Sequence, residues 1–216
     1  MKKKALRWKK RPKANTLKQY GELKEQLREE INATVVAGFD ILWLDECMFT
    51  RKTVPLIEWS NKLTNIEVEE ETINEPAYAL LMAVSDHSGV ELAKVYKKSV
   101  NIEKFLKYVE ELRAKTEGRK IALFMDNLSV HRSKKVLKEL DHCGIRYIFN
   151  LPFSPTLNPI ELCFSKVKQS FKAQRLQSIV RGMKPNIHTL IHRAVKTLTQ
   201  EDISNCIRHA EKEQQK

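Results

Sequence analysis

The chain lacks the long apolar segments that a membrane protein needs. No apolar run approaches the roughly 20 residues that span a bilayer. The basic N-terminus is not followed by an apolar stretch, so it does not have the pattern of a signal peptide. We therefore expect an intracellular protein that works without a membrane, in the nucleus of a eukaryote or the cytoplasm of a bacterium.

Cysteines are few, and their spacing suits neither a zinc finger nor a disulfide scaffold. No two of them form a Cys-x-x-Cys pair, and we expect reduced, mostly buried thiols at all four positions: Cys47, Cys143, Cys163 and Cys206. His188 and His192 have the spacing of zinc ligands on a helix, but no third ligand is evident, which indicates an ordinary helix face. Internal repeats are also absent, so 216 residues suit one large domain with extensions.

Charge is distributed unevenly along the chain. The net charge is +12, and residues 1–30 and 162–216 each hold eleven Lys or Arg and four Asp or Glu, which is +7 at each end. Residues 31–161 have a net charge of −2. Basic ends suit a polyanion such as nucleic acid, although solvated helix faces would give the same balance.

Helical spacing and short apolar runs predict the order of the elements. The pattern predicts helices at 16–32, 101–115, 133–143, 158–174 and 187–211, and strands at 41–44, 53–59, 78–85, 90–96, 120–125 and 146–150, with an acidic loop or hairpin at 67–75. The first half is rich in strands, and strands alternate with helices in the second half. This order indicates an α/β domain with a mixed sheet.

We divide the chain into three parts. Residues 1–36 are expected to form a basic arm and a linker helix, residues 37–178 the α/β domain, and residues 179–216 a C-terminal helical extension. Trp8 in the arm could stack on DNA or pack on the domain. The arm also supplies the candidate DNA contacts Lys9, Lys10 and Arg11.

Three acidic residues are placed where an α/β fold would bring them together. Asp45 and Asp126 each end an apolar strand, and sites in open α/β sheets gather at the carboxyl ends of strands. Glu161 opens a helix after a proline-rich loop, and it is the only acid between Asp141 and Glu201. Three carboxylates from distant segments would suit Mg²⁺ or Mn²⁺. Two such ions, about 3.5–4 Å apart, would clamp the attacking and leaving oxygens of an in-line phosphoryl displacement.

Each of these acids lies in a distinctive local sequence. The three sequences are LWLDE at 42–46, LFMDNLSVH at 123–131 and LPFSPTLNPIE at 151–161, with 34 residues between the last two acids. Together they resemble the catalytic motifs of the Tc/mariner transposase superfamily, including its bacterial insertion-sequence branch. The resemblance implies a ribonuclease-H-like mixed sheet flanked by helices. It also implies metal-dependent cleavage of DNA and transfer of the strand ends into target DNA, with metal ligands at Asp45, Asp126 and Glu161.

Some positions depart from the family pattern. Its third motif usually has Asp and Tyr where this chain has Thr156 and Phe153, but neither position is a metal ligand in the family. The resemblance covers roughly residues 10–210. Family members usually carry a helix-turn-helix domain before the catalytic strand, where this chain has the basic arm. We therefore expect a linker and catalytic domain that acts on double-stranded DNA, as a homodimer or with a separate DNA-reading partner.

For each residue beside the acids, both a functional and a structural role are open. Asn127 could bond Asp126 or a phosphate, or could form a turn. His131 could contact DNA or orient a metal ligand, or could cap the following helix. Glu46 should point to the opposite face of its strand from Asp45, where it would assist the site or form a salt bridge.

Three functions fit these observations. The first is an active polynucleotidyl transferase, which the intact set of acids favours. The second is a catalytically inactive, domesticated or truncated transposase that binds DNA or assists assembly, which the lack of a recognisable DNA-reading domain favours. The third is another ribonuclease-H-like nuclease acting on RNA–DNA hybrids, and the SPTLNPIE sequence argues against it.

Overall fold

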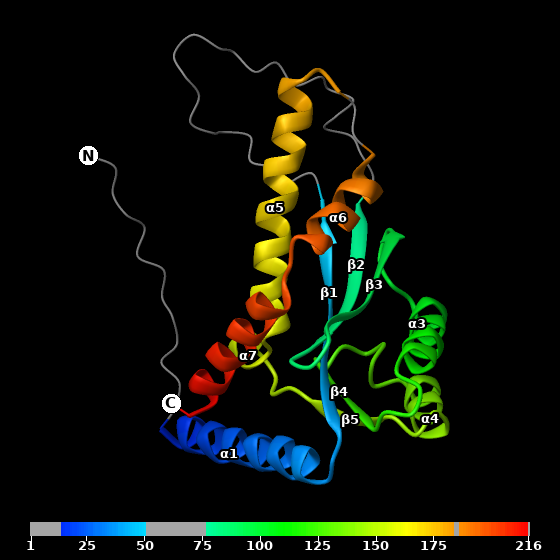
Figure 1. Cartoon of the computed structure of the whole chain (residues 1–216). Helices are drawn as coiled ribbons and strands as arrows, with labels where there is room; N and C mark the ends of the chain where they lie inside the picture. Colours follow the sequence, from blue (N-terminus) through cyan, green and yellow to red (C-terminus); the bar gives the residue numbers. More distant parts are fainter. Residues whose placement is uncertain (1–13, 51–76, 184–185, 216) are drawn as a thin grey trace, which may run out of the picture.

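The computed structural model describes residues 14–50, 77–183 and 186–215 (Figure 1). In chain order the elements are α1 (Ala14–Val36), β1 (Asp40–Phe49), β2 (Tyr78–Ser85), β3 (Gly89–Lys97), α3 (Ile102–Lys115), β4 (Ile121–Met125), α4 (Lys134–His142), β5 (Arg146–Phe149), the 3-10 helix η2 (Pro155–Leu157), α5 (Ile160–Val180), α6 (Ile187–Lys196) and α7 (Gln200–Gln215). None of the described helices is long and apolar enough to cross a membrane.

The five strands form one mixed sheet in the order β3-β2-β1-β4-β5. β2 and β3 form a hairpin, and β2 pairs antiparallel with β1. On the other side of β1, β4 and β5 run parallel to it and to each other. The predicted α/β class with a mixed sheet is confirmed.

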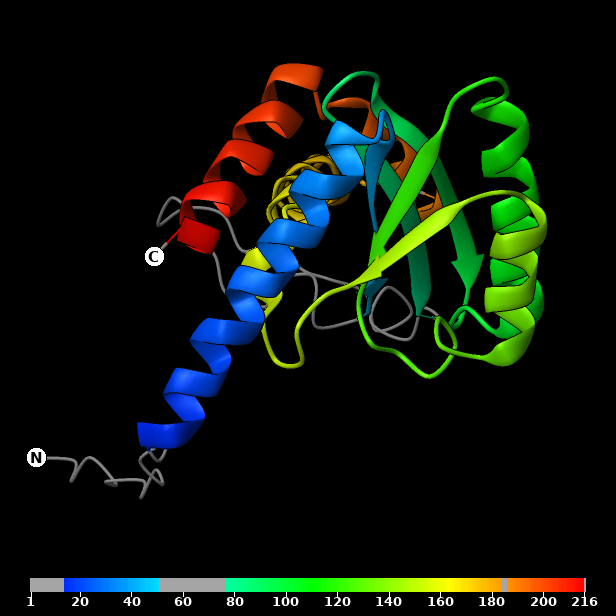
Figure 2. The same cartoon turned by 90° about the horizontal axis from the view of Figure 1, so that it is seen from below.

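Helices cover both faces of this sheet. Figure 2 shows α5, α6 and α7 on one face and α3 and α4 on the other. Alternate residues of β1 divide between the two cores, because successive side chains of a strand point to opposite faces. Trp43 packs against Phe124 on the α5 side, with ring centroids 4.6 Å apart, and Leu44 joins Phe105 on the α3 side. The central strands are therefore held from both faces.

β1 is longer than the apolar run predicted, so the expectation that Asp45 ends its strand is wrong. Parallel pairing with β4 stops at Trp43, opposite Phe124. Antiparallel pairing with β2 continues to Phe49, opposite Tyr78, and keeps the chain extended. Asp45 therefore lies just where β1 continues past the end of β4.

The C-terminal helices also differ from the prediction. α5 extends beyond the expected end at 174 to Val180, and the single helical region predicted at 187–211 is two helices, α6 and α7. The break follows from reciprocal capping, in which the Thr199 amide donates to Asp202 Oδ2 (3.2 Å) and the Asp202 amide to Thr199 Oγ1 (3.1 Å). The proposed division at 178 falls just before the end of α5 and stays a prediction.

Other sequence predictions are confirmed or fall outside the described residues. Asn101 caps α3 through its side-chain oxygen, as expected; Ser133 caps α4 in the same way, a role that the sequence had not assigned to it. All four cysteines are free, and all but Cys143 are buried. The predicted strand at 53–59, the acidic loop at 67–75 and the basic arm with Trp8, Lys9, Lys10 and Arg11 lie outside the described part of the chain.

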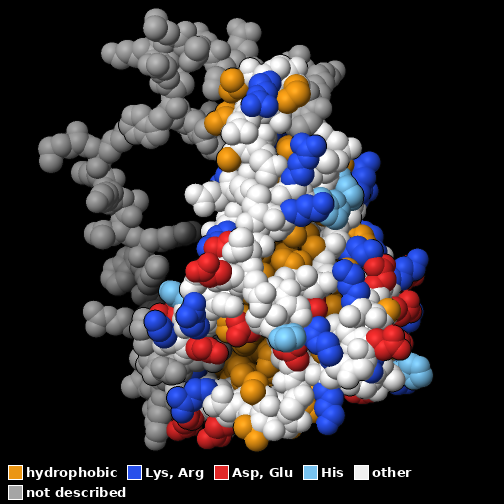
Figure 3. All heavy atoms as spheres, in the orientation of Figure 1, with side chains coloured by type: hydrophobic (Ala, Val, Ile, Leu, Met, Phe, Trp, Pro, Cys, Tyr) orange, Lys and Arg blue, Asp and Glu red, His pale blue; other side chains and the backbone are white. Residues whose placement is uncertain are grey.

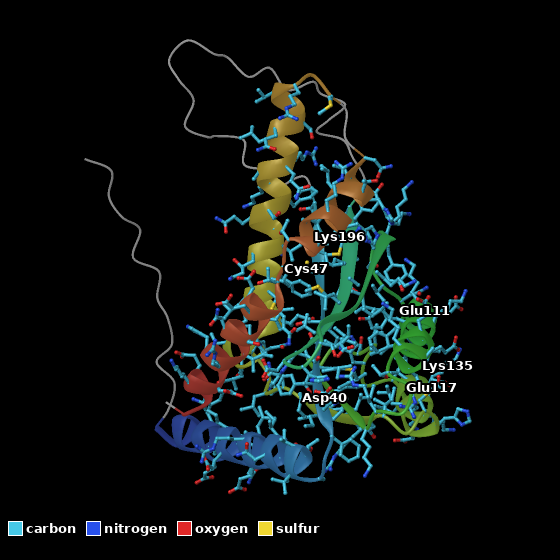
Figure 4. All side chains as sticks on the ribbon, viewed as in Figure 1. Asp40, Cys47, Glu111, Glu117, Lys135 and Lys196 are labelled. Atoms are coloured by element: carbon cyan, nitrogen blue, oxygen red, sulfur yellow. The ribbon has the colours of Figure 1, made fainter. Side chains whose placement is uncertain are left out.

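An ionic network ties the start of β1 to the hairpin. The Arg119 guanidinium donates to Asp40 and to both carboxylate oxygens of Glu91, at 2.8 and 3.0 Å. Ser85 Oγ donates to the same Glu91 carboxylate at 2.6 Å. Figure 4 labels Asp40 near the base of β1 and Cys47 farther along the same strand. The network therefore joins β1, β2 and β3 at the end of the sheet from which β1 starts.

Candidate active site

A pocket of about 290 Å³ opens where β1 continues past β4. It is lined by all three predicted acids, by Asn127 and Leu128 after β4, and by most of the loop from Asn150 to Asn158. The acids come from β1, from the end of β4 and from the first turn of α5. The fold thus brings together three carboxylates that are far apart in the sequence.

Asp45 is buried and held on both of its carboxylate oxygens. Oδ1 accepts the Glu46 amide at 2.7 Å, and Oδ2 accepts Asn158 Nδ2 at 3.3 Å. Burial, together with the nearby charges of Asp126 and Glu161, raises the pKa of Asp45 to about 7. The mutual repulsion of three neighbouring carboxylates is therefore part of what raises this pKa.

Asp126 is oriented by His131. The His131 Nδ1 lies 2.7 Å from Asp126 Oδ1, and the Leu128 amide donates to the same oxygen at 3.1 Å. The imidazole is buried and packs against the Phe105 ring at a centroid distance of 4.7 Å. Of the three roles open for His131, orienting a candidate ligand is supported, the helix cap is wrong because Ser133 caps α4, and contact with DNA stays a prediction.

Glu161 stands in the first turn of α5, and its side chain is exposed. Its carboxylate accepts no hydrogen bond from the described residues, whereas its amide donates to the Asn158 carbonyl at 3.3 Å. A carboxylate in a first helical turn is favoured by the unpaired amides and the helix dipole. The carboxylates of Asp45 and Asp126 are thus held by hydrogen bonds, whereas the described residues donate none to the Glu161 carboxylate.

The loop before α5 contains two asparagines that the sequence analysis did not single out. Asn158 bonds Asp45, and its Oδ1 also accepts the Ile160 amide at 3.4 Å, so it links β1 to the start of α5. Asn150 Nδ2 donates to the Ser154 carbonyl at 2.8 Å. Both lie in or beside the LPFSPTLNPIE motif, which was the available signal, but their partners are set by the fold.

Asn127 and Glu46 also have defined partners. Asn127 Nδ2 donates to the Asn150 carbonyl, and its Oδ1 accepts Arg132 Nη1 at 2.7 Å. It thus ties the end of β4 to the end of β5 and does not bond Asp126. Glu46 lies on the α3 face of β1, opposite to Asp45, and burial raises the pKa of its carboxyl despite the amide of Val100 and the charge of His131.

The donor set of the pocket fits a hard divalent cation. Its candidate ligands are all carboxylate oxygens, which Mg²⁺ and Mn²⁺ prefer. Within the described residues, however, no three His, Cys, Asp or Glu side chains are already drawn together tightly enough to enclose one ion. His188 and His192 lie against each other with their rings tilted by 59°, at 4.6 Å between ring centroids. Asp45, Asp126 and Glu161 therefore border the pocket without yet closing on a common point.

A second hollow of about 420 Å³ adjoins the first. The two share Pro155, Asn158 and Glu161, and the second is also lined by Leu162 and by His209 of α7. Glu161 thus stands between two connected depressions. The two hollows meet at Glu161, and Asp45 and Asp126 line the first of them.

Comparison with known proteins identifies the family. The family model of DDE superfamily endonucleases matches residues 40–184, which include all three acids. The chain belongs to the DDE superfamily of endonucleases. The family predicted from the three sequence motifs is confirmed. Membership in it indicates a nuclease-type enzyme. Among curated proteins, none matches the chain in sequence.

Solved structures of similar fold agree with this membership. The catalytic domain of Mos1 transposase with Raltegravir and Mn is 12% identical, with a TM-score of 0.62 over 96% of this chain and 95% of that one. The Mos1 paired-end complex with the left transposon end is 13% identical, with a TM-score of 0.57 over 97% of this chain and 67% of that one. This DDE endonuclease therefore has the predicted ribonuclease-H-like fold.

Proposed function

We propose that this chain is the catalytic domain of a transposase that cuts DNA and joins the cut ends to target DNA. The observation that carries the proposal is the pocket itself, which Asp45, Asp126 and Glu161 all line in a DDE endonuclease domain. The Mos1 structures of similar fold were solved with Mn, with Mg and with transposon-end DNA, which supports the same class of cofactor and substrate.

The three acids would hold two divalent ions. When bound, such ions activate the attacking water or 3′-hydroxyl and offset the charge on the leaving oxygen. Asp45 is fixed by Asn158 and Asp126 by His131, so these two carboxylates are presented in set orientations. Glu161 is exposed and lines the pocket from the first turn of α5. This arrangement pairs two preorganised ligands with one adjustable ligand.

Basic helices offer a surface for the DNA backbone. The sequence has no acid between Glu161 and Glu201, a stretch that includes nearly all of α5 and the whole of α6. Figure 3 shows Lys and Arg side chains over α6 and the upper part of α5, without acidic side chains among them. Phosphate contacts by Lys and Arg supply affinity that does not depend on sequence. We assign the duplex to this surface and the cut strand to the two hollows that meet at Glu161.

Nicking of a supercoiled plasmid tests the proposal. With Mn²⁺ or Mg²⁺ the protein, fused if necessary to a DNA-reading domain, should nick or join DNA, and a chelator should stop the reaction. Asp126→Asn should lower the rate at least about 100-fold while leaving thermal unfolding nearly unchanged, because it weakens metal binding with little change in shape.

A matched control uses an acid outside the pocket. Asp141 is exposed on α4, and Asp141→Asn should nick like the parent. An Asp126→Asn variant as fast as the parent would refute the assigned site. DNA binding without any metal-dependent nicking would instead favour an inactive DNA-binding or assembly protein.

A further inference from the structure

Arg132 is an exposed cation that is held beside the active-site pocket. Its Nη1 donates to Asn127 Oδ1 at 2.7 Å, and its guanidinium carbon lies 5.0 Å from the centroid of the Phe149 ring. Asn127 lines the pocket and directly follows Asp126. The guanidinium therefore has a defined place against the pocket wall, although the residue as a whole is exposed.

The segment between β4 and α4 fixes the position of Arg132. The Arg132 amide donates to the Leu128 carbonyl at 3.1 Å, and the next residue, Ser133, caps α4. Asn127 Nδ2 in turn donates to the Asn150 carbonyl, which anchors the side chain that holds the guanidinium. A side chain that is already oriented loses less conformational freedom when it binds a ligand.

The charge of Arg132 is not balanced by an acid within the described residues. None of the ion pairs among them includes Arg132, and its two side-chain contacts are a neutral amide and an aromatic ring. Arg119 is different, because its guanidinium is shared between Asp40 and Glu91. A guanidinium carries several N–H donors in a fixed fork, and the bond to Asn127 uses one of them. Arg132 thus has both donors and charge to offer to a ligand.

We infer that Arg132 binds a DNA phosphate next to the phosphate that reacts at the acids. This inference rests on the proposed DNA-cutting function. Divalent ions at Asp45, Asp126 and Glu161 would serve the reacting phosphate, whereas the neighbouring phosphates of the strand are best matched by a cation of the protein. A guanidinium suits this task, since two parallel N–H groups match two phosphate oxygens. Arg132 therefore fixes where the strand lies and takes no part in the chemistry.

Binding over a salt series tests the phosphate contact without requiring activity. Several unrelated labelled duplexes are titrated with the full chain in chelator, and binding is followed by fluorescence anisotropy at increasing salt. Arg132→Gln should weaken binding of every duplex by about 10-fold, and it should lower the slope of log affinity against log salt by about 0.9, the value for one phosphate contact. Arg132→Lys should keep the slope, because one charge remains, but should bind more weakly than the parent.

Lys138→Gln is the matched control, because Lys138 is an exposed cation within α4, farther from Asn127 along the chain. This change should alter neither the affinity nor the slope. Arg132→Gln also loses the contacts with Asn127 and Phe149, and thermal unfolding measures that loss separately. A lower unfolding temperature with an unchanged slope would make Arg132 only a clamp between the ends of β4 and β5, and would overturn the inference.

Uncharged phosphates show where along the strand Arg132 makes its contact. The sites that the parent nicks on a short duplex are mapped with Mn²⁺, and single phosphates flanking one site are then replaced by methylphosphonates. With DNA below saturation, one neighbouring replacement should slow nicking by the parent about 10-fold. The same replacement should slow Arg132→Gln no further, because both changes remove one and the same contact.

The outcomes separate this inference from the proposed function. Losses that add to that of Arg132→Gln at every replaced phosphate would overturn the inference. Nicking that depends on metal and on Asp126, with an unchanged salt slope in Arg132→Gln, would reject this inference alone. A slope that falls in Arg132→Gln but not in Lys138→Gln, without metal-dependent nicking, would reject the proposed function and leave the phosphate contact standing.

Discussion

Single side chains decide how the acids of the pocket are presented. Asp126 depends on His131, which is buried between that carboxylate and the Phe105 ring. Asp45 depends on Asn158, which reaches it from the start of α5. Neighbours that orient metal ligands commonly matter almost as much as the ligands themselves. His131 and Asn158 are accordingly positioning residues for the proposed metal site.

We expect His131→Ala to lower the affinity for divalent metal clearly, and to lower the stability of the fold much less. The change leaves Asp126 Oδ1 with only the Leu128 amide, so the carboxylate loses its fixed orientation. Loss of such a neighbour typically lowers metal affinity or activity about 10- to 100-fold. The measurement is the nicking rate over a Mn²⁺ series, in which the half-saturating concentration should rise.

Phe105→Leu is the control for packing, because it alters the contact with the imidazole and keeps the hydrogen bond to Asp126. It should lower stability without moving the Mn²⁺ dependence. The same Mn²⁺ dependence in His131→Ala and the parent would show that His131 is only a core residue.

At the scale of elements, α1 is joined to the active-site loop. Leu27 and Ile31 bury one side of α1 against the core, whereas Leu23 is 47% exposed. Figure 2 shows the N-terminal half of α1 extending away from the sheet. The Tyr20 hydroxyl, 2.8 Å from Ser154 Oγ, ties this half to the loop that carries Phe153. Movement of α1 would therefore be transmitted to the pocket.

Tyr20→Phe should loosen this connection. Loss of one hydrogen bond of this kind lowers stability by about 0.5–1.5 kcal/mol, and Ser154 keeps its bond to the Pro152 carbonyl. Hydrogen exchange should show faster exchange in the loop at 151–158 and in the first turns of α1. Leu23→Ala is the control, and equal exchange in the loop of both variants would reject the link.

The ionic network at the start of β1 should make the stability of the fold depend on pH. Burial acts to raise the pKa of Glu91, but hydrogen bonds from Arg119 and Ser85 outweigh it and lower that pKa below its usual 4.5. A lowered pKa stabilises the fold at pH values above 4.5, and this contribution is lost as the pH falls through the lowered value. The free energy of unfolding should therefore fall in acid partly through Glu91.

Glu91→Gln should remove this part of the acid dependence. At neutral pH the variant should be less stable by about 1–3 kcal/mol, because a charge-assisted bond to Arg119 is lost. Urea unfolding from pH 7 to 3 should show a flatter decline than in the parent. Exposed Glu201→Gln serves as the control, and parallel curves for Glu91→Gln and the parent would contradict the assignment.

The whole molecule brings like charges together in one pocket. Burial and the charges of Asp126 and Glu161 raise the pKa of Asp45 to about 7, so the native state carries repulsion that a bound cation would relieve. A ligand that binds only the folded state stabilises the fold by mass action. The proposed site therefore couples metal binding to global stability.

Divalent metal should raise the unfolding temperature of the parent. At a concentration about 100 times the dissociation constant, the expected rise is roughly 5–10 °C for a chain of this size. Differential scanning calorimetry with Mg²⁺ or Mn²⁺ measures it, and Asp141→Asn should behave like the parent. A rise of the same size in Asp126→Asn would place the ion somewhere else.

Local patterns in the sequence were sufficient for the identity of the site and for most elements. The apolar runs before Asp45 and Asp126 predicted two neighbouring strands, and the LPFSPTLNPIE sequence placed Glu161 at the start of a helix. The cap at Asn101 was predicted for the same reason, since a cap involves residues only three positions apart. These features depend on interactions between residues that are near one another in the chain.

Only the tertiary structure decided the features that depend on distant partners. β1 extends to Phe49 because β2 pairs with it there, and no local signal in its sequence marks that length. His131 and Asn158 reach the acids because the strands and α5 converge on one pocket. Phe153 is exposed because bonds from Asn150 and Tyr20 hold its loop. The sequence by itself determined which groups do the chemistry, and long-range pairing determined how they are oriented, because orientation depends on contacts that the local pattern does not contain.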